Sequence, residues 1–153
     1  TRCVGVRVSR RRLGAQCLYE HKATSCTDVT GFGLLGHLVE MVKASSVDVE
    51  LDLNAIPYMD GAIETVAMGI TSSLQPQNLR LRRAVKNLDV VGNDPRYPLL
   101  FDPQTAGGLL ASVPQESAQE CVEALRALGY LHSAIIGRVL PEGDALEPIT
   151  LIV

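Results

Sequence analysis

Two glycine-rich segments of this chain place an acidic residue and hydroxyl side chains directly ahead of glycines. The first segment covers residues 27–37 (TDVTGFGLLGH), and the second covers residues 101–110 (FDPQTAGGLL). A helix N-terminus offers unpaired N–H groups and partial positive charge, and glycine lets a ligand approach the backbone closely. A carboxylate at such a place, here Asp28, can hold a cation that a phosphate group also contacts. The two segments therefore indicate a site for a phosphate and a metal ion.

The first segment also contains a pattern associated with dinucleotide binding. Residues 31–36 (GFGLLG) match G-x-G-x-x-G, and Glu50 and Asp52 follow at about the distance where that pattern places its ribose carboxylate. However, the pattern needs a buried apolar strand before its first glycine, and residues 25–30 (SCTDVT) are mostly polar. Glu50 and Asp52 fall in an alternating segment whose outward face needs polar residues in any case. The context therefore does not favour nicotinamide or flavin binding.

A purely structural interpretation of the first segment is the second alternative. It makes Asp28 and the threonines turn and cap residues, and it lets the glycines serve tight helix packing. This interpretation accounts for the threonines and for Gly36. It gives no reason for an acidic residue directly before a glycine-rich helix start.

Hydrophobic periodicity predicts the helices and strands that must position these segments. A helix from Leu34 onward, with Thr30 as its candidate N-cap, buries an apolar stripe and places His37 and Glu40 on the opposite side. The other predicted helices cover residues 9–22, 60–68 (capped by Asp60 and ended by Gly69), 79–88 and 116–128 (ended by Gly129). The predicted strands cover residues 47–53, 109–113, 134–140 and 148–153, and residues 71–78 are predicted as a loop.

The length and composition of the chain suit one domain with a substantial core. It has 153 residues, of which 46% are hydrophobic. The apolar side of the helix over residues 9–22 is predicted to carry Leu13, Cys17 and Leu18. The mix of helices and strands, with a pair of strands closing the chain, predicts an α+β fold.

The charges are distributed unevenly along the chain. Residues 1–12 hold five arginines and no acidic residue, whereas the rest of the chain holds nine basic and 17 acidic residues. An acidic body argues against nucleic acid as the main partner, and a short basic end is typical of a solvated terminus. Nothing in the sequence resembles a secretory signal or a membrane span, so we expect a cytoplasmic protein with no membrane partner.

The four cysteines form no C-x-x-C pair, which agrees with reduced thiols in the cytoplasm. Cys17, His21 and Cys26 lie close together in sequence, but no fourth ligand accompanies them. This spacing therefore does not favour a zinc site. Cys121 falls on the apolar side of a predicted helix and is expected to be a small buried hydrophobic residue.

Both glycine-rich segments resemble the signatures of one enzyme family. Residues 27–41 (TDVTGFGLLGHLVEM) resemble the first signature of the selenophosphate synthetases (selenide, water dikinases), and residues 102–109 (DPQTAGGL) resemble the second. Related enzymes of purine biosynthesis and hydrogenase maturation share the shorter Thr-Gly-x-Gly pattern without its continuation. The resemblance covers residues 13–153 and implies an AIR synthase-like C-terminal domain with a mixed sheet flanked by helices. Residues 1–12 depart from the family and would be a divergent basic lead or a linker remnant.

The resemblance also implies an activity for the longer protein to which such a domain belongs. The family makes selenophosphate, AMP and orthophosphate from ATP, selenide and water, with Mg²⁺ as the metal. Its subunits form homodimers and have an N-terminal ATP-binding domain with a reactive cysteine or selenocysteine and a nearby lysine. We therefore expect no catalytic nucleophile in this chain, no turnover by the chain alone, and its own N-terminal domain, ATP and selenide as partners.

Individual residues take roles from the same resemblance. Asp28 matches the position where the family's C-terminal domain supplies a carboxylate to the magnesium cluster. From their placement beside Asp28 rather than from the resemblance, Thr27, Thr30, Gly31 and Gly33 are candidate contacts of the phosphates or of the groups around the metal, and Asp102 and Thr105 are candidates to face the same cleft. For the second segment an ordinary turn remains an equal alternative, and Ala106 stands where the family commonly has serine. His37 is expected to form a surface ion pair with Glu40.

Two other functions remain open from the sequence. The chain could be a non-catalytic packing or partner-binding domain that keeps only the fold. It could also belong to a related ATP-dependent synthetase of the same superfamily, although the first signature disfavours this.

Overall fold

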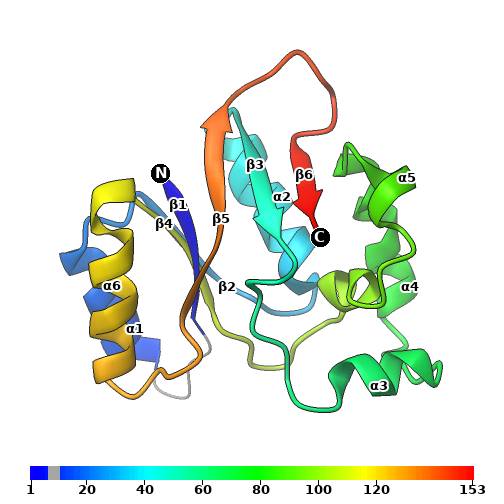
Figure 1. Ribbon diagram of the computed structural model, residues 1–153, viewed down its shortest axis with the longest axis horizontal. Helices are drawn as coiled ribbons and strands as arrows, with labels where there is room; N and C mark the ends of the chain where they lie inside the picture. The colour runs from blue at the N-terminus through cyan, green and yellow to red at the C-terminus, as the bar shows by residue number, and fades with distance from the viewer. Residues whose placement is uncertain (7–10) are drawn as a thin grey trace.

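A mixed β-sheet is the centre of the fold in the computed structural model, which describes residues 1–6 and 11–153 (Figure 1). The strand order among these residues is β2-β4-β1-β5-β3-β6. All neighbouring strands are antiparallel except β3 and β6, which are parallel. The strands are β1 (Arg2–Val6), β2 (Ser25–Asp28), β3 (Val47–Asp52), β4 (Leu109–Val113), β5 (Ala134–Pro141) and β6 (Ile149–Ile152).

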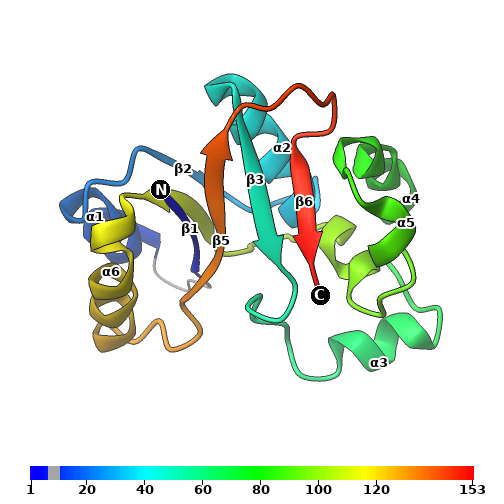
Figure 2. The ribbon, with the colours of Figure 1, turned by 45° about the horizontal axis from the view of Figure 1, so that its top comes forward.

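The helices cover both faces and one end of this sheet. The α-helices are α1 (Arg11–Glu20), α2 (Gly33–Ser45), α3 (Ala62–Ala67), α4 (Gln75–Asn78), α5 (Leu88–Val91) and α6 (Gln115–Ala127). Two 3-10 helices, η1 (Leu79–Ala84) and η2 (Tyr97–Phe101), complete the set. Helices α1 and α6 lie together near β1 and β4, whereas α4 and α5 gather at the opposite end beside β6 (Figure 2).

Alternation along the strands divides the core into two clusters, one on each face of the sheet. On one face, Val4 and Val113 pack under α1 and α6 against Leu18 and Leu125, all almost completely buried. On the other face, the α2 stripe packs on the sheet together with the segments between β3 and β4. The predicted stripe of α2 is confirmed, with Leu35, Leu38, Val39 and Val42 buried and Met41 partly buried. The predicted α+β class with a mixed sheet is also confirmed.

The segments with clear periodicity fold as predicted. Strands β3, β4, β5 and β6 and helix α6 agree with their predicted positions within a residue or two at each end. Gly69 and Gly129 follow their helices with positive φ angles of 74° and 95°, as helix-ending glycines do. In the described part of the chain, no helix has the length and apolar character needed to cross a bilayer.

Two strands lie where none was predicted. Strand β2 is short and mostly polar, so it carries no alternation that could reveal it. Strand β1 lies within residues 1–12, where a basic lead was expected, and occupies the middle of the sheet between β4 and β5. The two closing strands do not pair with each other, because β3 lies between them.

Several helix predictions were wrong in detail. Leu13 is exposed, and the buried residue beside it is Gly14, which packs near Leu109 and Tyr130. Residues 9–10 of the first predicted helix lie outside the described residues. The N-cap of α3 is Gly61 rather than Asp60. The predicted loop over residues 71–78 contains α4, and the predicted helix over residues 79–88 is the 3-10 helix η1, followed by an extended residue.

Candidate functional site

The two glycine-rich segments are held side by side by backbone hydrogen bonds. Beyond the pairing of β2 with β4, the Val29 N–H donates to the Gly108 carbonyl (2.9 Å), and the Gly107 N–H donates to the Val29 carbonyl (3.1 Å). One residue further on, the Gln104 N–H donates to the Thr30 carbonyl (3.0 Å). The segments that resemble two separate signatures therefore continue one antiparallel pairing at the edge of the sheet.

Glycines allow this close approach at two places. A Cβ atom on Gly107 would overlap the carbonyl oxygen of Val29. A Cβ atom on Gly33 would lie 2.8 Å from the carbonyl carbon of Phe101 and 2.9 Å from the carbonyl oxygen of Leu100, and its φ of 69° is unfavourable for other residues. Gly107 thus lets the second segment pair with the first, and Gly33 lets the start of α2 pack on η2.

Asn78 connects the two segments from a third direction. Its Nδ2 group donates to the carbonyls of Gly31 (2.8 Å) and Phe101 (3.0 Å), and the side chain is almost completely buried. Because buried backbone carbonyls need partners, this one amide fixes the middle of the first segment against the start of the second. No sequence signal pointed to Asn78, which was predicted to end a loop.

His37 supports the first segment from inside helix α2. The Thr30 N–H donates to Nε2 of the ring (3.1 Å), so Nε2 is unprotonated and the ring proton is on Nδ1, which faces the Glu40 carboxylate at 3.4 Å. The Thr30 hydroxyl also lies 3.2 Å from Nε2. The predicted pairing with Glu40 is present, but the expected surface position was wrong because the His37 side chain is only 9% exposed.

Thr30 was also wrongly expected to cap helix α2. The N-cap is Phe32, which makes no side-chain capping hydrogen bond. The Thr30 carbonyl instead accepts the N–H of Gly33 (3.1 Å), so the Gly33 amide is already engaged within the turn. Thr30 therefore holds the shape of the first segment through His37, Gln104 and Gly33.

The remaining residues of the first segment lie at the edge of the sheet. Asp28 is the last residue of the edge strand β2 and is half-buried. Its neighbour Val29 packs into the core beneath α2, so the alternation of a strand places Asp28 on the opposite face. The Thr27 hydroxyl donates to the Asp28 carbonyl (3.4 Å). Gly31 is exposed, and an added Cβ atom there would meet no atom within 4 Å, while its carbonyl accepts from Asn78.

A cavity of about 430 Å³ lies beside the second segment. Asp102 and Gln104 line it together with Gly107 and Gly108, while Asp28 is not among its lining residues. The segment after β3 supplies another part of the wall, which the sequence did not predict. There the buried Tyr58 hydroxyl has no hydrogen-bond partner among the described residues, and burial raises the pKa of Tyr58 to about 12. Thr105 is exposed outside this lining.

Burial also raises the pKa of the four thiols, of which Cys3, Cys17 and Cys121 belong to buried residues. The pKa rises to about 11 for Cys3 and to about 12 for Cys121, and it is raised for Cys17 as well. A thiol with a raised pKa holds little thiolate near neutral pH, and the thiolate is the nucleophilic form. These three thiols are therefore poorly suited to nucleophilic chemistry.

Replacing Asp102 by asparagine should stabilise the chain slightly at neutral pH. Burial raises the pKa of Asp102, while the hydrogen bond from Gln104 Nε2 (2.8 Å) lowers it in part. The folded state thus holds the carboxyl proton more tightly than the unfolded state, so stability falls as pH rises from the unfolded pKa of about 3.9 through the raised folded value. Asparagine removes this cost, which solvent screening limits to at most about 1 kcal/mol.

Urea unfolding at several pH values measures this effect. The stability gain of Asp102→Asn should be present at pH 7. It should disappear below the pKa of the carboxyl group in the unfolded chain, because Asp102 is then protonated and as neutral as asparagine. Asp144→Asn, at an exposed aspartate, is the matched control and should show no gain. Destabilisation by Asp102→Asn at pH 7 would contradict the burial argument.

A family model describes most of this chain. The model "AIR synthase related protein, C-terminal domain" matches residues 7–146. The chain belongs to this family. The signatures at residues 27–41 and 102–109, which are paired at the sheet edge, lie within the matched range.

Within the family, the chain is similar to selenide, water dikinases. It is 38% identical over 143 residues to the enzyme of Clostridioides difficile, covering 92% of this chain and 40% of that enzyme. It is also 38% identical over 151 residues to the enzyme of Treponema denticola, covering 95% of this chain and 42% of that enzyme. The expected resemblance to selenophosphate synthetases is confirmed, and the chain spans about 40% of the length of the curated relatives it matches.

Solved structures support the fold. Hydrogenase maturation protein HypE superimposes with a TM-score of 0.60 at 22% identity, covering 92% of this chain and 37% of that protein. A structure of HypE in complex with ATP gives a TM-score of 0.54, covering 84% of this chain. At this identity, the comparison bears on the fold of the family domain alone.

Proposed function

We propose that this chain is the C-terminal domain of a selenophosphate synthetase, which makes selenophosphate, AMP and orthophosphate from ATP, selenide and water. The observation that carries the proposal is the backbone pairing of the two signature segments through Val29 and Thr30. Similarity to selenide, water dikinases over 92% of the chain supports the same conclusion. The relatives are more than twice as long, and the catalytic nucleophile and lysine are assigned here to an N-terminal domain, as the family resemblance implies.

Asp28 is the residue that would hold Mg²⁺ in this proposal. It ends an edge strand, is half-buried and offers the hard oxygen that Mg²⁺ prefers. Magnesium sites usually combine one or two carboxylates with phosphates and water, so the other ligands come from ATP and the N-terminal domain. When bound, the metal neutralises phosphate charge during transfer.

Some of the other candidate residues hold the first segment in its shape, and others would contact the phosphate groups. Thr30 and Gly33 position the segment, since their polar backbone groups are engaged internally. Gly31, which is exposed and has open space at its Cα, is the better candidate for a phosphate contact through its N–H, with the Thr27 hydroxyl beside Asp28. In the second segment, Asp102 and the exposed Thr105 would face the nucleotide cleft that this domain closes.

Two alternatives remain beside this proposal. A non-catalytic packing domain would keep the paired segments for the sake of the fold alone, and Asp28 would then be a turn residue. A related ATP-dependent synthetase would use the same segments with another substrate than selenide.

Activity measurements on two forms of the protein test the proposal. The full-length gene product that includes this chain should release AMP and orthophosphate from ATP only when selenide is present, and it is expected to be a homodimer. The 153-residue chain alone should release neither. Turnover by the isolated chain would contradict the two-domain proposal, and a full-length protein inactive with selenide would favour an alternative.

A further inference from the structure

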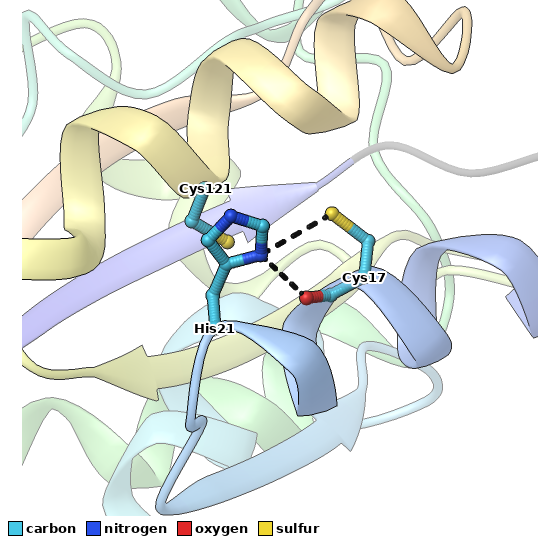
Figure 3. Close-up of side chains that lie close together, drawn as sticks. All are labelled: Cys17, His21 and Cys121. Atoms are coloured by element: carbon cyan, nitrogen blue, oxygen red, sulfur yellow. Dashed lines mark hydrogen bonds between the residues drawn. The ribbon is translucent and has the colours of Figure 1, made fainter.

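Two cysteines and a histidine meet between helices α1 and α6 (Figure 3). Cys17 comes from α1, His21 directly follows α1, and Cys121 comes from the middle of α6. One potential ligand atom of each residue lies within 4.8 Å of the others. The sequence had grouped Cys17 and His21 with Cys26, but Cys26 is exposed on β2 and the third member is Cys121.

The spacing of these atoms fits a tetrahedral metal ion. Zn–S bonds of about 2.3 Å and Zn–N bonds of about 2.0–2.1 Å at a tetrahedral angle separate sulfur from nitrogen by about 3.5 Å and two sulfurs by about 3.8 Å. The Cys17 Sγ and His21 Nδ1 atoms are 3.7 Å apart. The upper limit of 4.8 Å for the other pairs leaves a contraction of at most about 1.0 Å between the two sulfurs and about 1.3 Å between the Cys121 sulfur and the imidazole nitrogen.

We propose that Cys17, His21 and Cys121 bind a thiophilic divalent metal ion, in the first instance Zn²⁺. Sulfur and imidazole nitrogen are the ligands that zinc prefers, whereas Mg²⁺ prefers oxygen, so this site is distinct in chemistry from the one proposed at Asp28. The three protein ligands leave a fourth position for water or an added ligand.

The charge balance suits a site at this depth. Cys17 and Cys121 are 4% and 0% exposed, so a net charge between these helices would be costly. When Zn²⁺ binds, both thiols lose their protons to solvent and the imidazole binds as a neutral ligand. Two thiolates cancel the charge of the ion, and the complex is neutral.

His21 needs a change of tautomer and a turn of the ring away from the Cys17 carbonyl to take part. In the metal-free chain its Nδ1–H donates to the Cys17 carbonyl (2.8 Å), which also accepts the backbone N–H of His21 (3.1 Å). Moving the ring proton to Nε2 frees Nδ1 for the metal, and the carbonyl keeps its backbone partner. The ring also stands at the C-terminal end of α1, where the partial negative charge of the helix favours a cation.

Metal titration of the reduced 153-residue chain tests the proposal. Co²⁺ serves as the spectroscopic probe, since thiolate ligands give it a charge-transfer band in the near ultraviolet, and Zn²⁺ should displace it. We expect one ion per chain and the release of two protons for each Zn²⁺ bound.

Single substitutions identify the ligands. Cys17→Ser and Cys121→Ala should each weaken Zn²⁺ binding by more than the roughly 10–100-fold that loss of an outer-shell partner costs, and should abolish or diminish the thiolate band. His21→Ala, at a partly exposed position, provides a variant that disturbs the core less. Cys26→Ser is the matched control, because Cys26 is exposed and outside the cluster, and it should bind as the parent chain does.

Three results would overturn the proposal. The first is a reduced chain that binds no Zn²⁺. The second is binding that persists in folded Cys17→Ser, Cys121→Ala and His21→Ala variants, with folding checked by circular dichroism. The third is a band that is lost only in Cys26→Ser.

Discussion

Replacing Asp28 by asparagine in the full-length protein should lower turnover at least about 100-fold, as the loss of one preorganised charge-stabilising group typically does. Asparagine keeps the shape of the side chain but removes the negative charge that would hold Mg²⁺. Asp28 lies half-buried at the end of an edge strand whose pairing uses backbone groups, so the fold should survive the change. This expectation rests on the proposed function.

The measurement is selenide-dependent release of AMP as a function of Mg²⁺ concentration. Asp28→Asn should require more Mg²⁺ and reach a lower maximum rate, while its circular dichroism and thermal unfolding stay close to those of the parent protein. Asp144→Asn, which removes an exposed charge between β5 and β6, should behave as the parent does. Near-normal turnover by Asp28→Asn would assign this aspartate to the turn and remove it from the metal site.

Gly33→Ala, in the first segment, should destabilise the chain strongly, because two separate costs arise at this position. Its backbone has a φ of 69°, a conformation that costs other residues about 1–2 kcal/mol. The added Cβ atom would also press on the backbone of η2, at 2.8 Å from the Phe101 carbonyl carbon, and overpacking typically costs about 1–3 kcal/mol. The unfavourable φ and the contact with the η2 backbone are separate effects of the same added methyl group. We therefore expect the two costs to add, to roughly 2–5 kcal/mol.

Alanine substitutions at two other glycines allow the backbone cost and the packing cost to be measured separately. Gly69 has a similar φ of 74° but no atom within 4 Å of an added Cβ, so Gly69→Ala should show the backbone cost alone. Gly31 has an open surrounding and no positive φ, so Gly31→Ala should leave the stability almost unchanged. Urea unfolding of the three variants gives the comparison. Equal losses for Gly33→Ala and Gly69→Ala would contradict the packing of the first segment on η2.

Elements with one solvent-exposed face and one buried face could be predicted from the sequence, because their hydrophobic residues recur with a regular period. Strand β3 alternates between buried Val49 and Leu51 and partly exposed acidic residues, and it forms as predicted. Strand β2 could not be found in the same way, because its stability comes from pairing with β4 rather than from its own apolar residues. The position of β2 therefore depends on its pairing with β4, which the local sequence pattern does not reveal.

In the candidate site, too, the features that depend on local sequence could be predicted and those that depend on distant contacts could not. The signature segments and Asp28 could be identified from residue types and their order. The roles of His37 and Asn78 could not, because each depends on a partner that only the folded chain brings near: the Thr30 N–H for His37 and two carbonyls for Asn78. The meeting of Cys17 with Cys121 likewise depends on the packing of α1 on α6.

The central position of β1 has a consequence for the order of folding. The register joins Arg2 to Val113 in β4 and to Arg138 in β5, so the first strand pairs with segments more than one hundred residues away. Without β1, the sheet would separate into a β2-β4 pair and a β5-β3-β6 group. Such high contact order slows folding, because the entropy of closing long loops is lost before the new contacts compensate. On the ribosome, the first strand therefore has to wait until nearly the whole domain has been synthesised.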